Sequence, residues 1–164
     1  MELAEGHSSA FGFAIKNDNM PALQEYINRE LKDFDSSKTY KVDFIWQSED
    51  LPNYRNTILD IGNLKGVWGQ GVPEPQIAIE HIIITSHNIT LMSADKNPTI
   101  KIQLEDNISL IKFKSSLEEF ERLSQNVVII NAIGTCNINE WNGNINPQIF
   151  IEDYEIVNSY NYYF

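Results

Sequence analysis

The stretch Val127-Val128-Ile129-Ile130-Asn131-Ala132-Ile133, with the turn Asn142-Gly143 after it and a second apolar run over 147–154, decides the fold. Both residues of an Asn-Gly pair tolerate positive φ, so this pair between two apolar runs is the strongest local signal for a β-hairpin. Apolar residues fall on both faces of the first strand, which indicates that both of its faces are covered. A closed barrel accounts for such a strand better than an open sheet with one wet face.

The rest of the chain supplies further short strands. Alternation over 40–46 predicts a strand whose aromatic residues Tyr40, Phe44 and Trp46 face the core. A strand at 76–85 is expected to be broken or bulged near Glu80-His81. Additional strands are predicted at 88–93, 99–104 and 108–114.

Two short helices complete this part of the chain. One is expected within 48–60, and the other over 117–123, where Ser116 is the N-cap and Glu119 stands at the capping-box position. Many short strands with two short helices predict a mainly β fold, a small antiparallel barrel of the oligonucleotide/oligosaccharide-binding (OB) type.

The opening residues have a different pattern. A polar segment precedes a predicted strand at 11–15, and Pro21 begins a helix with one apolar stripe through about Phe34. One strand and one helix cannot build a domain, so this part is expected to be the end of a larger α/β unit. The predicted domains are 1–37, ending in a linker at 35–38, and 38–157. An aromatic tail at 158–164 is expected to dock on the body.

Composition limits the possible functions. The chain has 164 residues, 42% of them hydrophobic, and a net charge of −11. No run approaches the roughly 18 apolar residues of a membrane span, and the N-terminus lacks a secretion signal, which favours a cytoplasmic protein without a membrane partner. The single cysteine, Cys136, fits a reducing compartment and is expected to be a buried structural thiol. The negative charge argues against strong DNA binding by this chain alone, because binding to phosphates depends on cationic side chains.

The chain shows no catalytic constellation of its own. His7, His81 and His87 are scattered, and no Asp/His pair has metal-ligand spacing on one element, so neither catalytic residues nor a metal site are predicted. The loop 66–75 lacks the Gly-Lys-Ser/Thr of a phosphate-binding loop and is interpreted as structural. The residues assigned to that structural role are Trp68, Gly69, Gly71, Pro73 and Pro75.

Three segments together resemble the C-terminal end of the RecJ family of bacterial single-stranded-DNA exonucleases. Gly6-His7-Ser8-Ser9-Ala10 resembles the Gly-Gly-His motif of the family's DHH-associated (DHHA1) domain, and 69–75 is similar to its Gly-x-Gly-Asn-Pro-Glu-Pro loop. Residues 139–153 resemble its closing hairpin. The chain departs from the family pattern at Glu5, where the first glycine of the motif would stand, and at Val72, where the loop has asparagine.

The resemblance implies that 1–37 is the remnant of a DHHA1 domain and that the OB domain follows it. The parent would be a 5′-to-3′ single-stranded-DNA exonuclease of repair and recombination, bacterial or phage-encoded. Its divalent metal, Mn or Mg, would be held by a DHH domain that this chain lacks. The fragment alone is expected to be inactive and to hold no cofactor, and single-stranded DNA is its expected partner in the full enzyme.

Two groups of residues are candidates for contacting DNA. Gly6, His7 and Ser8 would approach a phosphate, by the resemblance. Trp141 beside the Asn-Gly turn would stack on a base, although it would equally serve to cap the barrel. The candidate cationic cluster is Lys112 and Lys114 on one strand face, joined by Lys101 if the two strands pair; a solvated face is the alternative.

A second functional hypothesis comes from the acidic charge. The chain would then be a protein-interaction module that docks a repair partner such as a helicase or a single-strand-binding protein. A third hypothesis is an architectural domain that braces a catalytic core. Salt dependence separates DNA contact from apolar docking, because only DNA contact weakens steeply with salt.

Overall fold

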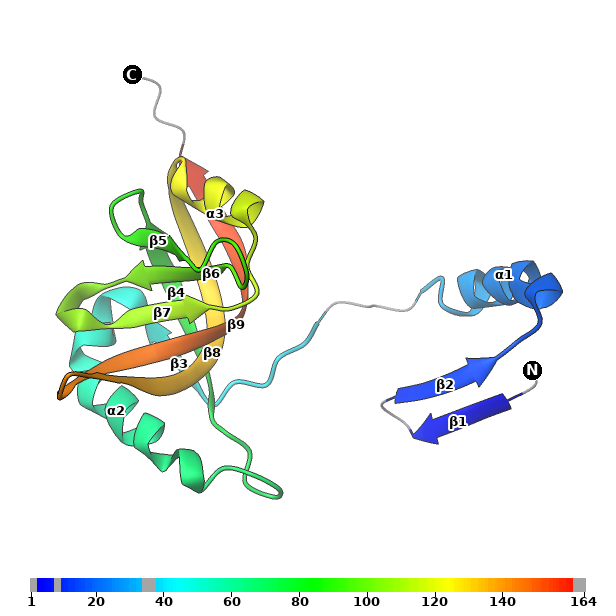
Figure 1. The fold of residues 1–164 in the computed structure, drawn as a ribbon, viewed down its shortest axis with the longest axis horizontal. Helices are drawn as coiled ribbons and strands as arrows, with labels where there is room; N and C mark the ends of the chain where they lie inside the picture. The colour runs from blue at the N-terminus through cyan, green and yellow to red at the C-terminus, as the bar shows by residue number, and fades with distance from the viewer. Residues whose placement is uncertain (1–2, 8–9, 34–37, 161–164) are drawn as a thin grey trace. The chain divides into compact units, whose positions relative to one another are not determined.

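The computed structural model describes residues 3–7, 10–33 and 38–160, and it divides the chain into two compact units, 1–40 and 41–164 (Figure 1). In the first unit, strands β1 (Leu3–His7) and β2 (Ala10–Ala14) form an antiparallel pair. A 3-10 turn, η1 (Asn17–Asn19), leads into helix α1 (Met20–Glu30), which has Pro21 in its first turn as expected. Strand β1 was not anticipated, because its small polar end at Gly6-His7 carries no strand signal.

Helix α1 is amphipathic but has no buried residue. Tyr26, Ile27 and Leu31, which belong to its predicted apolar stripe, are all exposed. An apolar stripe normally packs against another layer of structure. The first unit as described therefore has an amphipathic helix without a core beneath it.

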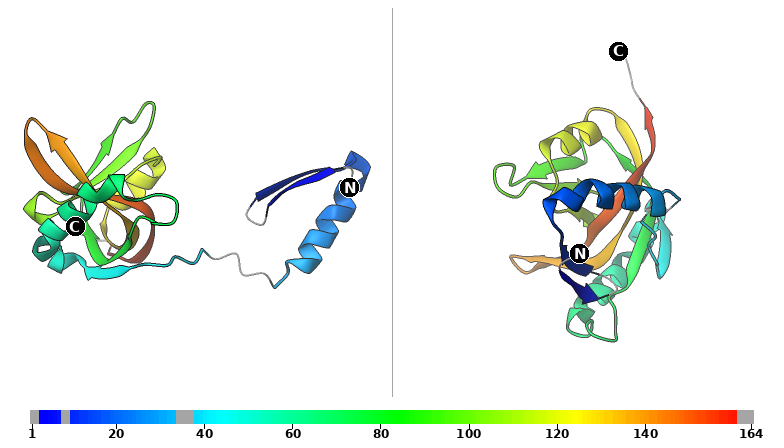
Figure 2. Two further views of the ribbon diagram at one scale, coloured as in Figure 1. Left: turned by 90° about the horizontal axis from the view of Figure 1, so that it is seen from below. Right: turned by 90° about the vertical axis from the view of Figure 1, so that its right-hand side faces the viewer.

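In the described part of the second unit, seven strands form one sheet in the order β3-β4-β8-β9-β7-β6-β5 (Figures 1 and 2). The strands are β3 (Phe44–Gln47), β4 (Gln76–Ile84), β5 (Ile89–Met92), β6 (Thr99–Gln103), β7 (Ser109–Lys112), β8 (Val127–Trp141) and β9 (Asn144–Tyr160). The helical segments are η2 (Ser48–Tyr54), α2 (Arg55–Asn63), η3 (Leu64–Gly66), η4 (Glu105–Asn107) and α3 (Leu117–Ser124). The expected mainly β fold with short helices is confirmed.

The long hairpin forms as the sequence predicts. Strands β8 and β9 pair from Val127 to the tip, where Trp141 lies opposite Asn144. Asn142 and Gly143 have φ of 50° and 78°, and a two-residue turn with positive φ at both positions matches the twist of the flanking strands. Because β8 and β9 are neighbours near the middle of the sheet order, this hairpin positions the other strands.

The expectation of a wholly antiparallel sheet needs correction. β3 pairs with β4 and β7 pairs with β9 in parallel. Parallel neighbours require a crossover connection, which η2 and α2 supply between β3 and β4. The connection from β7 to β9 passes through α3 and β8. The sheet is therefore mixed.

The strand predicted over 40–46 is shorter than expected. It begins at Phe44, and only Trp46 of the three aromatic residues is buried, at 6% exposure, where it stacks on Tyr54 with ring centroids 4.9 Å apart. Phe44 is 46% exposed. The reason is that β3 is an edge strand, which has a neighbour on one side only. Alternation along such a strand does not ensure burial of its whole inner face.

The core consists of isoleucine-rich rows on one face of the sheet. Along β4 the buried residues are Ile77 and Ile79, then Ile82 and Ile84, so the alternation slips by one residue. The pairing with β8 shifts at this place, and His81 takes a φ of 59°. A bulge adds one residue and returns the following side chains to the core face. The break predicted near Glu80-His81 is confirmed.

Helix α3 begins at its predicted cap. The Ser116 hydroxyl accepts a hydrogen bond of 3.0 Å from the Glu119 backbone N–H. We expect Ser116→Ala to lower the free energy of unfolding by about 1 kcal/mol, because one N–H at the helix start loses its acceptor. Urea denaturation followed by circular dichroism measures this. Ser116→Asp, an equally good cap, should restore the stability, and an alanine variant as stable as the parent would contradict the role of the cap.

Candidate nucleic-acid interface

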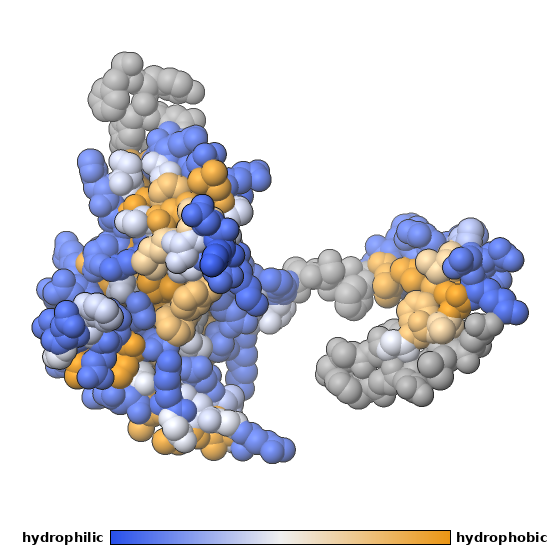
Figure 3. Space-filling model, in the orientation of Figure 1, coloured by the Kyte–Doolittle hydropathy of each residue, from blue (hydrophilic) through white to orange (hydrophobic). Residues whose placement is uncertain are grey.

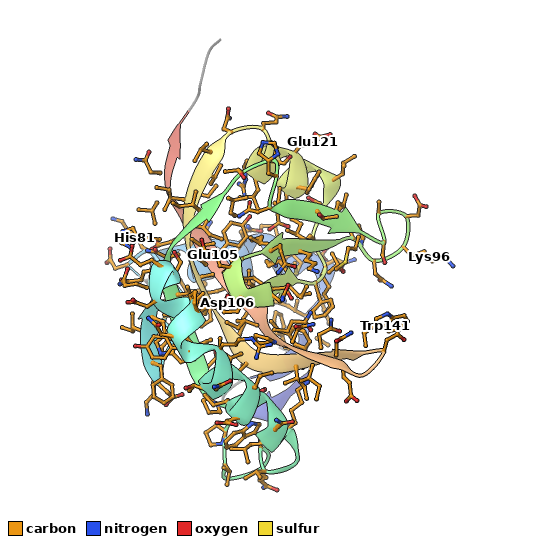
Figure 4. All side chains as sticks on the ribbon, turned by 90° about the vertical axis from the view of Figure 1, so that its left-hand side faces the viewer. His81, Lys96, Glu105, Asp106, Glu121 and Trp141 are labelled. Atoms are coloured by element: carbon orange, nitrogen blue, oxygen red, sulfur yellow. The ribbon has the colours of Figure 1, made fainter. Side chains whose placement is uncertain are left out.

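An exposed tryptophan stands at the tip of the long hairpin. Trp141, the last residue of β8, is 72% exposed (Figure 4). The register places Asn139 opposite Asn146 and Trp141 opposite Asn144. Residues directly opposite each other in a strand pair project from the same face. Four polar or aromatic side chains are thus collected on one face of the tip, where they line a shallow depression.

The turn after β6 closes one side of this depression. It contributes Asn107, whose φ of 58° lies in the left-handed region that asparagine tolerates. Arg55, at the start of α2, donates to the carbonyl oxygens of Asp106 and Ile145, each at 3.4 Å. This side chain joins the turn to the first residues of β9. It also brings a positive charge close to the depression.

These groups can bind an unpaired nucleotide. An exposed indole is a stacking surface for any base, because every base has a π-face. Each asparagine amide offers both donors and an acceptor, which match the edges of unpaired bases. The acidic side chains of Glu105 and Asp106 lie in the adjoining turn, so the site is not strongly cationic. Its chemistry favours stacking and hydrogen bonding over attraction of phosphates.

The structure does not assemble the proposed lysine cluster. Lys101 lies opposite Ile111, and Lys112 lies opposite Ile100, so the two lysines project from opposite faces of the sheet. Lys114 follows the end of β7, with a φ of 54°. The expectation that Lys101 joins Lys112 is therefore wrong, since the strand pairing shifts the two lysines by one residue.

The glycine loop has a local structure of its own. Gly69 and Val72 exchange two backbone hydrogen bonds, of 2.9 and 3.1 Å, around Gly71, whose φ of 88° requires glycine. Trp68 is half-buried, and its indole N–H has no hydrogen-bond partner in the described part of the chain. A structural role for this loop, which includes Pro73 and Pro75, remains a prediction.

The remaining candidates lie elsewhere. Gly6 and His7 belong to β1, and Ser8 lies outside the described residues. His81 occupies the bulge of β4, where its Nδ1 lies 3.0 Å from the Gln47 Oε1. Among residues 3–7, 10–33 and 38–160, no group of three or more His, Cys, Asp or Glu side chains is placed to hold a metal ion. A divalent metal therefore finds no fitting donor set among these residues.

Cys136 is fully buried, and burial, followed by the charge of Glu74, raises its pKa to about 12. The thiolate is the reactive form. We expect iodoacetamide at pH 8 to modify the folded chain at least about 100-fold more slowly than the chain in 8 M urea. Mass spectrometry over time measures both rates. Equal rates would show that the thiol is accessible and would contradict its structural role.

The mixed sheet with short helices and an exposed aromatic tip defines a β domain of the OB type. The family model described as the RecJ OB domain matches residues 51–153, and the chain belongs to this family. The resemblance stated from the three sequence segments is thereby confirmed. None of the described helices is both long and apolar enough to cross a membrane.

Several known proteins are similar over most of the chain. A putative SPbeta prophage-derived single-strand DNA-specific exonuclease, YorK, of Bacillus subtilis strain 168 is 35% identical over 159 residues, covering 95% of this chain and 27% of the relative. Single-stranded-DNA-specific exonuclease RecJ of the same strain is 25% identical over 158 residues, covering 90% and 19%. The chain thus spans about a quarter or less of the length of these relatives.

Solved structures share the fold. RecJ of Thermus thermophilus in complex with Mn²⁺ superposes with a TM-score of 0.56 at 18% identity, covering 93% of this chain and 22% of RecJ. The same protein in complex with Mg²⁺ gives a TM-score of 0.57 at 17% identity over the same shares.

Proposed function

We propose that this chain is the C-terminal OB part of a RecJ-like 5′-to-3′ single-stranded-DNA exonuclease of repair and recombination, and that it holds the strand instead of cleaving it. The observation that carries the proposal is the exposed Trp141 among asparagines on one face of the hairpin tip. The names of the relatives, which describe single-strand DNA-specific exonucleases, support the same substrate class.

Hydrolysis would be carried out by residues outside this sequence. The relatives are several times longer than this chain, and RecJ of Thermus thermophilus has been solved with Mn²⁺ or Mg²⁺. A divalent metal of the full enzyme would accordingly be held elsewhere. Residues 1–37 would be the end of a DHHA1 domain, which the exposed apolar stripe of α1 supports, and Gly6, His7 and Ser8 would contact a phosphate there. The enzyme would act in the cytoplasm.

Tryptophan fluorescence tests strand binding directly. Titrating the chain with oligo(dT) at low salt should quench the emission of Trp141, because stacking on a base removes it from water, whereas Trp46 is buried. The logarithm of the binding constant should fall linearly with the logarithm of salt concentration, by about 0.7 per phosphate contacted. Absence of any quenching at low salt would contradict the proposal.

A nuclease assay tests the separation of binding from cleavage. The purified chain with Mn²⁺ and a labelled single-stranded substrate should give no products. Reproducible cleavage by this chain would overturn the proposal that hydrolysis needs residues outside it.

One observation favours a second function. The net charge of −11 suits an acidic module that docks a repair protein, such as a helicase or a single-strand-binding protein. Binding of such a protein that persists at high salt, together with no oligonucleotide binding at low salt, would favour this module over the strand-holding function.

A further inference from the structure

The face that carries Trp141 is free of carboxylates over a long distance. The register continues from the tip through Asn144, Asn146 and Gln148 to Phe150, all on one face of β9. In the last of these rows, Phe150 lies beside Ile111, which lies beside Lys101. We call these rows of paired residues the amide face. None of its paired positions is Asp or Glu, although the chain has 23 acidic residues.

The far end of the amide face carries a second aromatic group. The Phe113 and Phe150 rings meet edge to face, with centroids 5.0 Å apart and planes at 76°. Phe113 is 49% exposed, and Lys65 Nζ lies 5.3 Å from the centroid of the Phe150 ring. Figure 3 shows apolar side chains gathered over β7 and β9 on the side of the larger unit turned to the viewer. Lys101 and Lys65 thus flank an exposed aromatic pair.

We propose that a single strand of nucleic acid lies along β9, from Trp141 to the Phe113–Phe150 pair. This inference rests on the proposed function and extends its site. The two ends are six residues apart on β9, or about 20 Å at 3.3 Å per residue. Bases stack on the aromatic groups at both ends, the amides of Asn146 and Gln148 bond to the strand between them, and Lys65 and Lys101 contact phosphates. A track of this length holds about four or more nucleotides, within the range of OB domains.

The charge distribution identifies the occupant. Acidic side chains dominate the chain as a whole, so their absence from this one face is the feature that a polyanion requires. The flanking acids lie at the borders: Asp106 in the turn before β7, and Glu152, which accepts a hydrogen bond from Gln76, beyond Phe150. An apolar protein partner would use the aromatic pair without needing the two lysines.

The test uses the whole 164-residue chain and 5′-fluorescein oligo(dT) of two, four, six and eight nucleotides, read by anisotropy. Affinity should rise steeply up to about six nucleotides and then level off. Phe113→Leu, which keeps an apolar side chain but removes the ring, should weaken the six-nucleotide complex about 10-fold and leave the two-nucleotide complex unchanged. Thermal melts establish that the variant is folded.

The lysines provide a matched comparison. Lys65→Ala and Lys101→Ala should each reduce the salt slope by about 0.7, the value for one phosphate of a single strand. Lys112→Ala removes the same charge from the opposite face of the sheet and should leave the slope unchanged. An effect of Lys112→Ala equal to that of Lys101→Ala would place the strand on the other face and overturn the track.

The length series separates this inference from the function on which it rests. Two nucleotides binding as tightly as eight, with Trp141 still quenched, would overturn the track while supporting strand binding at the tip. No binding of any length at low salt would overturn both. An unchanged salt slope in the Lys65 and Lys101 variants, with strong length dependence, would also overturn the path proposed along β9.

Discussion

Replacing Gly134 by alanine is expected to lower the free energy of unfolding by about 3 kcal/mol or more. A Cβ at this position would collide with the carbonyl oxygen of Phe150, and would lie 2.9 Å from its carbonyl carbon and 3.2 Å from the Ile151 Cα. All three atoms belong to the backbone of β9, so no flexible side chain can move aside. The collision also falls in the middle of the sheet order, where β8 and β9 shift register between Ile133 and Gly134.

Urea denaturation of the variant and the parent measures the effect as a change in midpoint at constant slope. Gly69→Ala is the matched control, because a Cβ at Gly69 meets nothing within 4 Å and its stability should change by no more than about 0.5 kcal/mol. If Gly134→Ala were as stable as the parent, β8 and β9 would not be in this register. The cross-strand rows that define the amide face would then be lost as well.

The parts of the fold that follow from local chemistry were predictable from the sequence. Asn142-Gly143 fixes the hairpin because both residues accept positive φ, and Ser116 fixes the start of α3 by capping it. The bulge of β4 was also predictable, since its buried isoleucines change parity between Ile79 and Ile82. Each of these features depends on residues close together in the chain.

The pairing of distant strands was not predictable in the same way. Nothing in the alternation of β3 tells that it pairs in parallel with β4 at an edge, which leaves Phe44 exposed. The relative phase of β6 and β7 has the same origin, and it places Lys101 and Lys112 on opposite faces. A shift of one residue in register moves every side chain of a strand to the other face.

The candidate site shows the same division. Trp141 was identified from its place beside the turn, whereas its asparagine neighbours were missed, because single asparagines carry little signal in an Asn-rich chain. A usable signal was present: Asn139 and Trp141 before the turn, and Asn144 and Asn146 after it, share one parity, and a two-residue turn pairs them across the hairpin. Asn107 comes from a distant turn and has no such signal.

Trp141→Ala is expected to weaken binding of a six-nucleotide oligo(dT) by about 10-fold to 100-fold, since loss of one base–aromatic stack costs about 1–3 kcal/mol. Stability should change by no more than about 0.5 kcal/mol, because the side chain is largely exposed at a turn. Trp141→Phe keeps a ring and should lose less affinity than the alanine variant. Anisotropy of labelled oligonucleotide measures the affinities, and thermal melts measure the stability.

The control for Trp141→Ala is Ile145→Ala. Ile145 is an exposed apolar residue at the same end of the hairpin, but it lies opposite Glu140 and so projects from the other face. Its carbonyl oxygen, which accepts from Arg55, is retained in the variant. If a strand lies on the face that carries the asparagines, only the tryptophan variant loses affinity. Loss of affinity in Ile145→Ala with normal binding by Trp141→Ala would place the strand on the opposite face, against Glu140, where a polyanion meets a carboxylate instead of amides.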